Sequence, residues 1–288
     1  MTAIKRVELG VYGAVIAFFV AAGMITSLLR HNGWYALLFA VVGSMAVVSV
    51  ALERAGSSPR TRRAIRIATM WCFAGLFGWL MTAKAVNFQM PQVVFDLGAA
   101  TVSGALIQLI ISRLLAPFLF GNAFCSRACW NGAVFELVRR PARKAGGIWQ
   151  VLRYLYLALT LAVPVLLMHA GFSTTGSEQT RRLWVLAENG LIFAFAAFTL
   201  PWWGSRAYCR LLCPALTISR WLAPWSRLKV SGRAELCTSC MLCEQQCPMT
   251  VPIVSFVTAD RRVAARDCIL CGRCVEECPT EALSLGFR

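Results

Sequence analysis

Apolar residues occupy most of the first 203 positions in long blocks, and short polar stretches rich in arginine separate these blocks. A helix needs roughly 20 apolar residues to cross the roughly 30 Å of hydrocarbon in a bilayer. Six blocks reach about that length, namely 9–29, 34–52, 67–86, 92–112, 151–171 and 183–203. The pattern therefore predicts a mainly α, polytopic helical membrane protein with about six transmembrane helices.

Composition supports a membrane protein and separates the C-terminal part from the rest. Hydrophobic residues make up 58% of the chain, charged residues only 15%, and the mean hydropathy is +0.62. Soluble domains are nearer 45–50% apolar. The first block follows Lys5 and Arg6 but is too long for a signal-peptide core, so we expect a retained helix. We predict a transmembrane domain over 1–204, a membrane-edge linker over 205–230 and a small α+β domain over 231–288.

Basic residues are distributed unevenly between the two sides that six crossings would create. With a cytosolic N-terminus, 25 of the 29 Lys and Arg residues fall on the cytosolic side. This is the positive-inside pattern, and it predicts that both termini and the C-terminal domain are cytosolic. The net charge of +16 is then explained by anionic lipid head groups beside the membrane spans, and a nucleic-acid partner is not required.

Eight of the 13 cysteines form two copies of the run C-x2-C-x2-C-x3-C-P in the last 52 residues. This spacing is typical of a bacterial ferredoxin with two 4Fe-4S clusters, in which the fourth cysteine of each run binds the other cluster. Cluster 1 would take Cys237, Cys240, Cys243 and Cys278. Cluster 2 would take Cys268, Cys271, Cys274 and Cys247.

Two other uses of these eight cysteines deserve comparison. Four-cysteine zinc sites usually show two separated C-x2-C pairs, without a third cysteine and a fourth followed by proline. A disulfide framework would conflict with a reducing cytosol. The spacing therefore favours iron–sulfur clusters over both alternatives.

Four more cysteines form two C-x3-C pairs, each a few residues after a predicted membrane helix. They are Cys125 with Cys129, and Cys209 with Cys213. Residues four apart share one face of a helix, so each pair could present two sulfurs to one object. We consider a third iron–sulfur cluster with nearby arginines (Arg127, Arg206, Arg210), a redox pair or soft-metal site such as Cu(I), and simple helix packing. Cys72 we assign to packing.

Paired C-x3-C motifs at helix ends, followed by a double 4Fe-4S run, resemble the membrane-bound polyferredoxins typified by NapH. That group also includes MauN-type proteins and relatives of CcoG and of the C-terminal part of NosR. Cys209, Cys213 and Pro214 match the family's C-x3-C-P motif, whereas Trp130 follows Cys129 where the family has proline. The resemblance implies electron transfer in a bacterial inner membrane, with quinol oxidation, copper reduction or maturation of a periplasmic dehydrogenase as the family's roles.

A quinone site would need polar groups near an apolar cleft, and few residues qualify. His169, Asp96 and Glu188 all fall toward the predicted noncytosolic side, where polar groups in membrane spans are often functional. The alternative is that they only meet lipid head groups. A haem between His31 and His169 is disfavoured because neither lies inside a span with a second histidine at haem spacing.

The motifs together predict an electron-transfer protein between a quinone pool or cytosolic donor and a redox partner protein. Iron–sulfur clusters exchange single electrons, and six apolar helices place them beside a membrane. Two alternatives remain, a cupric metalloreductase that uses the membrane-edge cysteines and a non-catalytic assembly factor for a periplasmic dehydrogenase. No P-loop, dinucleotide fingerprint or serine-nucleophile motif is present, so nucleotide or flavin chemistry would belong to a partner.

Overall fold

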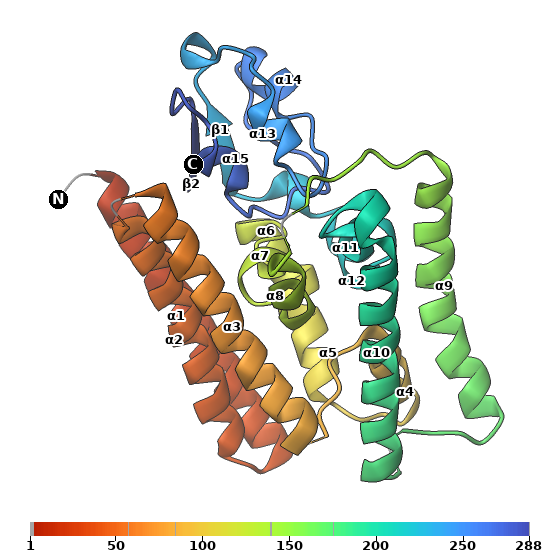
Figure 1. The fold of residues 1–288 in the computed structure, drawn as a ribbon. Coiled ribbons are helices and arrows are strands. Elements are labelled where there is room, and N and C mark those ends of the chain that lie inside the picture. The colour runs from red at the N-terminus through yellow and green to blue at the C-terminus, as the bar shows by residue number, and fades with distance from the viewer. Residues whose placement is uncertain (1–2, 57, 84, 139, 175, 288) are drawn as a thin grey trace. The chain divides into compact units, whose positions relative to one another are not determined.

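The structure is a computed structural model that describes residues 3–56, 58–83, 85–138, 140–174 and 176–287 (Figure 1). It divides into two compact units. The first unit reaches Thr69 and includes Phe287, and the second comprises Met70–Gly286. The division falls within one helix, α3, and all the candidate site residues belong to the second unit.

Within the described residues, five helices are long and apolar enough to cross a membrane, and they confirm the predicted class of a mainly α membrane protein. Each of the five helices is longer than the roughly 20 residues that a crossing needs. The five helices are α1 (Ala3–Arg30), α2 (Trp34–Ala55), α3 (Pro59–Ala83), α9 (Ile148–His169) and α10 (Glu178–Trp203).

In the first unit, α1 and α2 form a tight helical hairpin. The turn between them is made at His31, whose φ of 48° is left-handed. Gly23 and Gly43 allow the close approach, because added Cβ atoms would lie 2.8 Å from the Cβ of Phe39 and 2.7 Å from the Cβ of Phe19. Small residues let membrane helices pack backbone to backbone in this way.

The predicted fourth span, 92–112, is wrong as a single helix. Helix α4 (Met90–Gly98) ends early, and a new helical run begins at Gly104. Ser103 caps that run by accepting a hydrogen bond from the Leu106 amide at 3.2 Å. The run comprises α5 (Gly104–Leu109), a π-helical turn (Ile110–Leu115) and α6 (Ala116–Phe120), so the apolar segment here is Gly104–Phe120.

Short helices follow each of the two apolar segments that end near the C-x3-C pairs. After α6 come α7 (Phe124–Arg127) and α8 (Trp130–Glu136). After α10 come α11 (Ala207–Leu211), α12 (Pro214–Ser219) and a 3-10 turn (Ala223–Trp225). The predicted membrane-edge linker, 205–230, is therefore a series of short helical turns and not one continuous helix.

The C-terminal part is a small α+β fold. Strands β1 (Leu228–Gly232) and β2 (Leu283–Phe287) form a two-stranded sheet. Between the strands lie a 3-10 turn (Ala234–Leu236), α13 (Leu242–Gln245), α14 (Ile253–Thr258) and α15 (Arg273–Glu276). Val230, Val257 and Ile269 are each 1% exposed and form its core. The expected ferredoxin-like α+β domain is confirmed by this arrangement.

Candidate iron–sulfur sites

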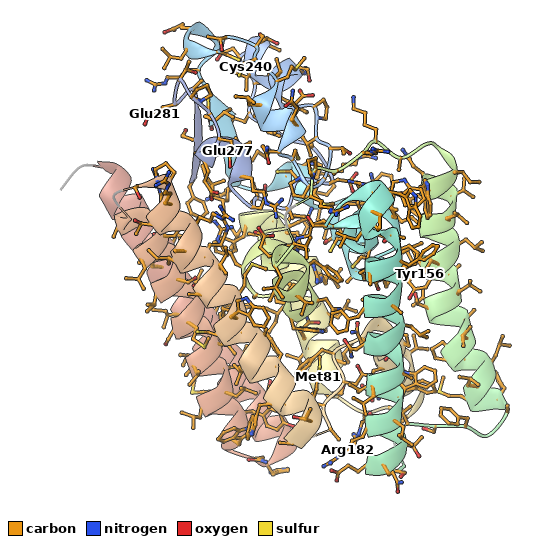
Figure 2. All side chains as sticks on the ribbon, viewed as in Figure 1. Met81, Tyr156, Arg182, Cys240, Glu277 and Glu281 are labelled. Carbon is orange, nitrogen blue, oxygen red and sulfur yellow. The ribbon has the colours of Figure 1, made fainter. Side chains whose placement is uncertain are left out.

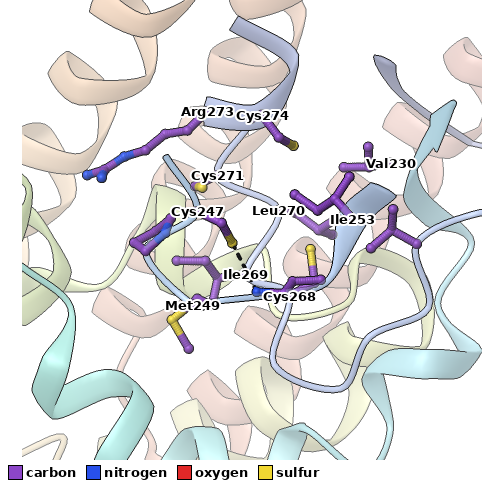
Figure 3. Close-up of a pocket in the computed structure, with 14 residues that line it drawn as sticks. Val230, Cys247, Met249, Ile253, Cys268, Ile269, Leu270, Cys271, Arg273 and Cys274 are labelled. Carbon is purple, nitrogen blue, oxygen red and sulfur yellow. Dashed lines mark hydrogen bonds between the residues drawn. The ribbon is translucent and has the colours of Figure 1, made fainter. Parts of the chain in front are cut away.

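The eight cysteines of the C-terminal runs line two separate cavities. One has about 390 Å³ of empty volume, part of it open to solvent, and its walls are mostly apolar (Figure 3). Its cysteines are Cys247, Cys268, Cys271 and Cys274. The other, of about 360 Å³, is lined by Cys237, Cys240, Cys243 and Cys278. The structure thus groups the cysteines as the sequence predicted, with the fourth cysteine of each run beside the other run.

Backbone conformation repeats in the two runs and suits an anionic cluster. Ser239 and Met241 have left-handed φ values of 54° and 64°, and Leu270 and Gly272 at the equivalent positions have 54° and 75°. Such residues turn successive amide groups toward one side and form concave nests that bind anions. The Val251 amide already donates a hydrogen bond to the Sγ of Cys247 at 3.4 Å. The donor set and the backbone therefore fit a thiolate-bound cluster.

Burial raises the pKa of several of these thiols above the ordinary value. It raises the pKa of Cys243 and Cys247 to about 11 and that of Cys268 to about 12. Because metals bind the thiolate, cluster insertion must displace these protons. Among the described residues, no three or more His, Cys, Asp or Glu side chains are placed closely enough to hold a single metal ion.

The structure also brings the four membrane-edge cysteines together. The thiol of Cys209 lies within electrostatic range of those of Cys213, Cys129 and Cys125, and the thiol of Cys213 within range of the last two. Burial raises the pKa of Cys213 to about 11. The four thiols therefore lie near one another, and we call them the four-thiol group; a shared centre there stays a prediction.

The expectation that each C-x3-C pair lies on one helix is wrong. Cys125 belongs to α7 and Cys209 to α11, whereas Cys129 and Cys213 are the residues just before α8 and α12. In each pair the second cysteine has an extended ψ, 120° and 112°, so the helix breaks between the two sulfurs. Both copies build the same turn, and each follows a glycine with left-handed φ.

Trp130 replaces the family's proline without changing this turn. It is the first residue of α8, as Pro214 is the first residue of α12. The first helical position suits proline because its missing amide has no helical partner there, but other residues also fit. The Trp130 ring instead packs against Phe77 and Phe88, with centroids 5.4 and 5.7 Å away. The departure from the motif therefore leaves the position of Cys129 intact.

Arginines surround the four-thiol group, and sequence reasoning missed one of the most direct contacts. Arg113, in the π-helical turn, donates from Nη1 to the Sγ of Cys125 at 3.0 Å and lies over the Phe124 ring. Arg206 is 1% exposed and donates to the carbonyl oxygen of Cys125 at 3.0 Å. The signal in the sequence was a charged residue at the end of an apolar block, where a π-turn often marks function.

Arg127 and Arg210 bind backbone carbonyls of the ferredoxin fold. Arg127 donates to the Leu270 carbonyl at 2.9 Å, and Arg210 donates to the Pro248 carbonyl at 3.1 Å. Asp267, next to Cys268, pairs with Arg153 and Arg220 at 3.0 and 2.8 Å. The loop that carries the cysteines of cluster 2 is thereby attached to the membrane-edge helices.

The three candidate quinone residues do not meet. His169 is exposed at the end of α9 and, among the described residues, has no hydrogen bond to either acid. Asp96 is 4% exposed and accepts from Gln92 at 2.8 Å. Glu188 accepts from Asn87 at 2.9 Å. Asp96 and Glu188 thus belong to buried polar contacts around α4, and His169 does not.

Comparison with known proteins supports iron–sulfur binding in both regions. A family described as a 4Fe-4S dicluster domain matches residues 236–283. A second family, described as a 4Fe-4S binding domain, matches twice, over 103–148 and 186–233. Each of the two latter segments contains one C-x3-C pair and the turn described above. No solved structure matches the chain.

Curated relatives include one protein named for electron transport and one named as ferredoxin-type. The electron transport protein YccM of Escherichia coli is 27% identical over 74% of the chain, and the ferredoxin-type protein NapH of Haemophilus influenzae is 26% identical over 76%. Protein NirI of Paracoccus denitrificans is 24% identical over 83%. The chain spans 63% of YccM, 82% of NapH and 38% of NirI.

Proposed function

The chain is a membrane polyferredoxin of the NapH type, and from this premise we propose that it carries single electrons between a quinone pool and a redox partner protein. The route would use two 4Fe-4S clusters and a third centre at the four membrane-edge cysteines. The observation that carries the proposal is the placement of two four-cysteine cavities and one four-thiol group in a single compact unit. Iron–sulfur centres supply one-electron chemistry when bound.

Contacts within this unit give the route an order. The cysteine loop of cluster 2 is attached to the membrane-edge helices through Asp267 and Arg127. Cys240 of cluster 1 is exposed, and Figure 2 shows it at the end of the ferredoxin fold opposite to α10. Electrons would therefore pass between the membrane-edge centre and cluster 2, and leave or enter the protein at cluster 1.

The charge around the four-thiol group favours an iron–sulfur centre there over copper. A cubane with four thiolate ligands carries net negative charge, and buried arginines would offset it. Arg113 and Arg206 are 5% and 1% exposed and lie against Cys125. A cationic copper ion would gain less from two neighbouring guanidinium groups. The match of both C-x3-C segments to a 4Fe-4S binding family supports the same choice.

A quinol would be oxidised near the membrane-embedded polar groups. It releases two electrons and two protons, so the centres would take the electrons one at a time while side chains accept the protons. Asp96 is suited to this because its Oδ2 is buried without a hydrogen bond. Glu188 is the second candidate.

Surface charge suggests the chemistry of the soluble partner. Every residue that lines the cavity of cluster 1 comes from 237–257 or 278–283. The segments 234–260 and 274–287 hold six of the 13 acidic residues of the chain and no Lys or Arg. Leu236, Met241 and Leu242 are exposed beside Cys240. A one-electron carrier with a basic face around its own cofactor would fit this surface.

Metal analysis tests the proposal directly. Anaerobically purified protein should contain about twelve iron and about twelve acid-labile sulfide per chain if three 4Fe-4S clusters are present. The Cys125→Ser, Cys209→Ser double variant should lose about four of each, and Cys72→Ser, an exposed position in α3, should lose none. A count of about eight that the double variant does not change would remove the third cluster. Copper that disappears in the double variant would favour the metalloreductase.

A further inference from the structure

A buried carboxylate links the membrane-edge cysteines to cluster 2. Glu136, the last residue of α8, is 8% exposed. Its Oε2 accepts from Arg206 Nη2 at 3.0 Å, and its Oε1 accepts from Arg273 at 2.7 Å from Nη2 and 3.2 Å from Nε. Arg206 and Arg273 are 1% and 2% exposed, so this Arg–Glu–Arg triad is almost completely removed from water.

Each arginine of the triad belongs to a different candidate site. Arg206 donates to the carbonyl of Cys125 and lies within electrostatic range of the thiols of Cys209 and Cys129. Arg273 is the residue before Cys274 and lines the cavity of cluster 2 (Figure 3). Glu136 therefore binds one arginine that contacts Cys125 and a second arginine that precedes Cys274 in the chain.

The local backbone is adapted to this triad. A Cβ added at Gly132 would lie 2.7 Å from Arg206 Nη1 and 2.8 Å from the Cys125 carbonyl. The absence of a side chain at Gly132 thus leaves room for the Arg206 guanidinium beside the Cys125 carbonyl. Burial raises the pKa of Glu136, but Arg206 and Arg273 outweigh it and lower the value to about 2, so the carboxylate is charged. A buried charge of this kind requires such partners.

We propose that Glu136 is a positioning residue for electron transfer between the membrane-edge centre and cluster 2. By binding both arginines, it fixes the two sites at one separation and sets how much positive charge each site experiences. This inference rests on the proposed function, which supplies the electron route that passes Glu136. The contacts themselves are independent of whether a quinone is the donor.

Electrostatics gives the sign of the effect. Reduction adds negative charge to a cluster, so a more positive surrounding stabilises the reduced form and raises the midpoint potential. Glu136→Gln keeps the size of the side chain but removes the charge that compensates two buried guanidinium groups. The midpoint potential of cluster 2 should therefore rise. Arg273→Gln removes a positive charge beside the same cluster, and its potential should fall.

Potentiometric titration followed by paramagnetic resonance tests this on the full chain in detergent. In Glu136→Gln the potential of cluster 2 should shift upward while that of cluster 1 is unchanged, and electron transfer between the membrane-edge centre and cluster 2 should slow. Glu244→Gln is the matched control, because Glu244 lies beside Cys243 of cluster 1 and accepts from the Val254 amide at 2.9 Å. It should shift cluster 1 and not cluster 2.

An unchanged potential of cluster 2 in Glu136→Gln, with both ferredoxin clusters intact, would overturn the inference. If Glu136→Gln loses its clusters, Arg273→Gln decides, and the absence of a downward shift there also overturns it. The iron count of the unmodified protein tests the proposed function separately, because it shows whether a third cluster is present. A protein with only two clusters can still show both shifts of cluster 2.

Discussion

The Nη1 atom of Arg113 lies 3.0 Å from the Sγ of Cys125. Arg113 belongs to the apolar run Gly104–Phe120. A guanidinium in such a segment is costly unless it meets a counter-charge, and the thiolate forms of the four cysteines would supply that charge. The Nε of Arg113 is buried without a hydrogen-bond partner, so the hydrogen bond from Nη1 to Cys125 is the polar contact that the structure shows for this guanidinium. This contact ties the membrane segment to the four-thiol group and gives a direct test of it.

Replacing Arg113 by Gln should lower the midpoint potential of the membrane-edge centre or weaken its retention. The reason is the loss of a positive charge in direct contact with a proposed ligand. Redox titration and iron analysis would measure both effects. Arg182→Gln, which removes an exposed arginine paired with Glu178, should leave them unchanged. An unaltered potential in Arg113→Gln would argue against an anionic centre at these cysteines.

The Gly132→Ala variant should disturb the same centre through sterics. The new methyl group would lie 2.7 Å from Arg206 Nη1 and 2.8 Å from the backbone oxygen of Cys125, so the structure must shift at a cost of about 1–3 kcal/mol. We expect partial loss of iron and a lower thermal midpoint. Gly190→Ala is the control, because nothing lies within 4 Å of its Cβ position. Equal behaviour of the two variants would contradict this account.

Charge reversal near cluster 1 should slow electron exchange with a basic partner. In the Glu235→Lys, Glu281→Lys double variant, two exposed acids of the cluster 1 surface become positive. Stopped-flow oxidation of the reduced protein by a basic c-type cytochrome should be slower by about tenfold or more at low salt, and less affected at high salt. Glu178→Lys, on α10, should leave the rate unchanged. A rate independent of salt and of both changes would exclude electrostatic docking at this surface.

Asp96 and His169 should differ in their effect on quinol oxidation. Asp96 is buried with an unpaired oxygen, whereas His169 is exposed at the end of α9. Asp96→Asn should therefore decrease quinol-dependent reduction of the clusters, and His169→Gln should not. Spectrophotometry with a water-soluble quinol analogue would measure the rates. Equal loss in the two variants would place the site at the membrane surface instead.

Periodicity and spacing were sufficient for the large features of the fold. Five of the expected apolar segments are long helices, because a crossing helix must be almost uniformly apolar. The 92–112 segment could not be placed correctly from hydropathy, since Ser103 caps a new helix inside the apolar block. A capping hydroxyl changes hydropathy little but decides where the backbone turns.

For the sites, the spacing of the cysteines predicted how they group, but the sequence did not indicate which other residues contact them. The grouping of Cys247 with the second run and of Cys278 with the first follows from the repeat alone. The roles of Arg113, Glu136 and Gly132 depend on contacts between segments far apart in the chain, which no local pattern encodes. The single-helix expectation for each C-x3-C pair failed because the second cysteine begins a new helix.

The duplicated glycine, short helix and cysteine turn has a consequence for biogenesis. One copy of the turn leaves the ribosome long before the other, with α9 and α10 still to be synthesised between them. The two cysteines of the first turn therefore remain without the other two, and open to oxidation, until the second turn is made. A centre bound by all four cysteines would therefore form only after the entire helical region has been inserted into the bilayer.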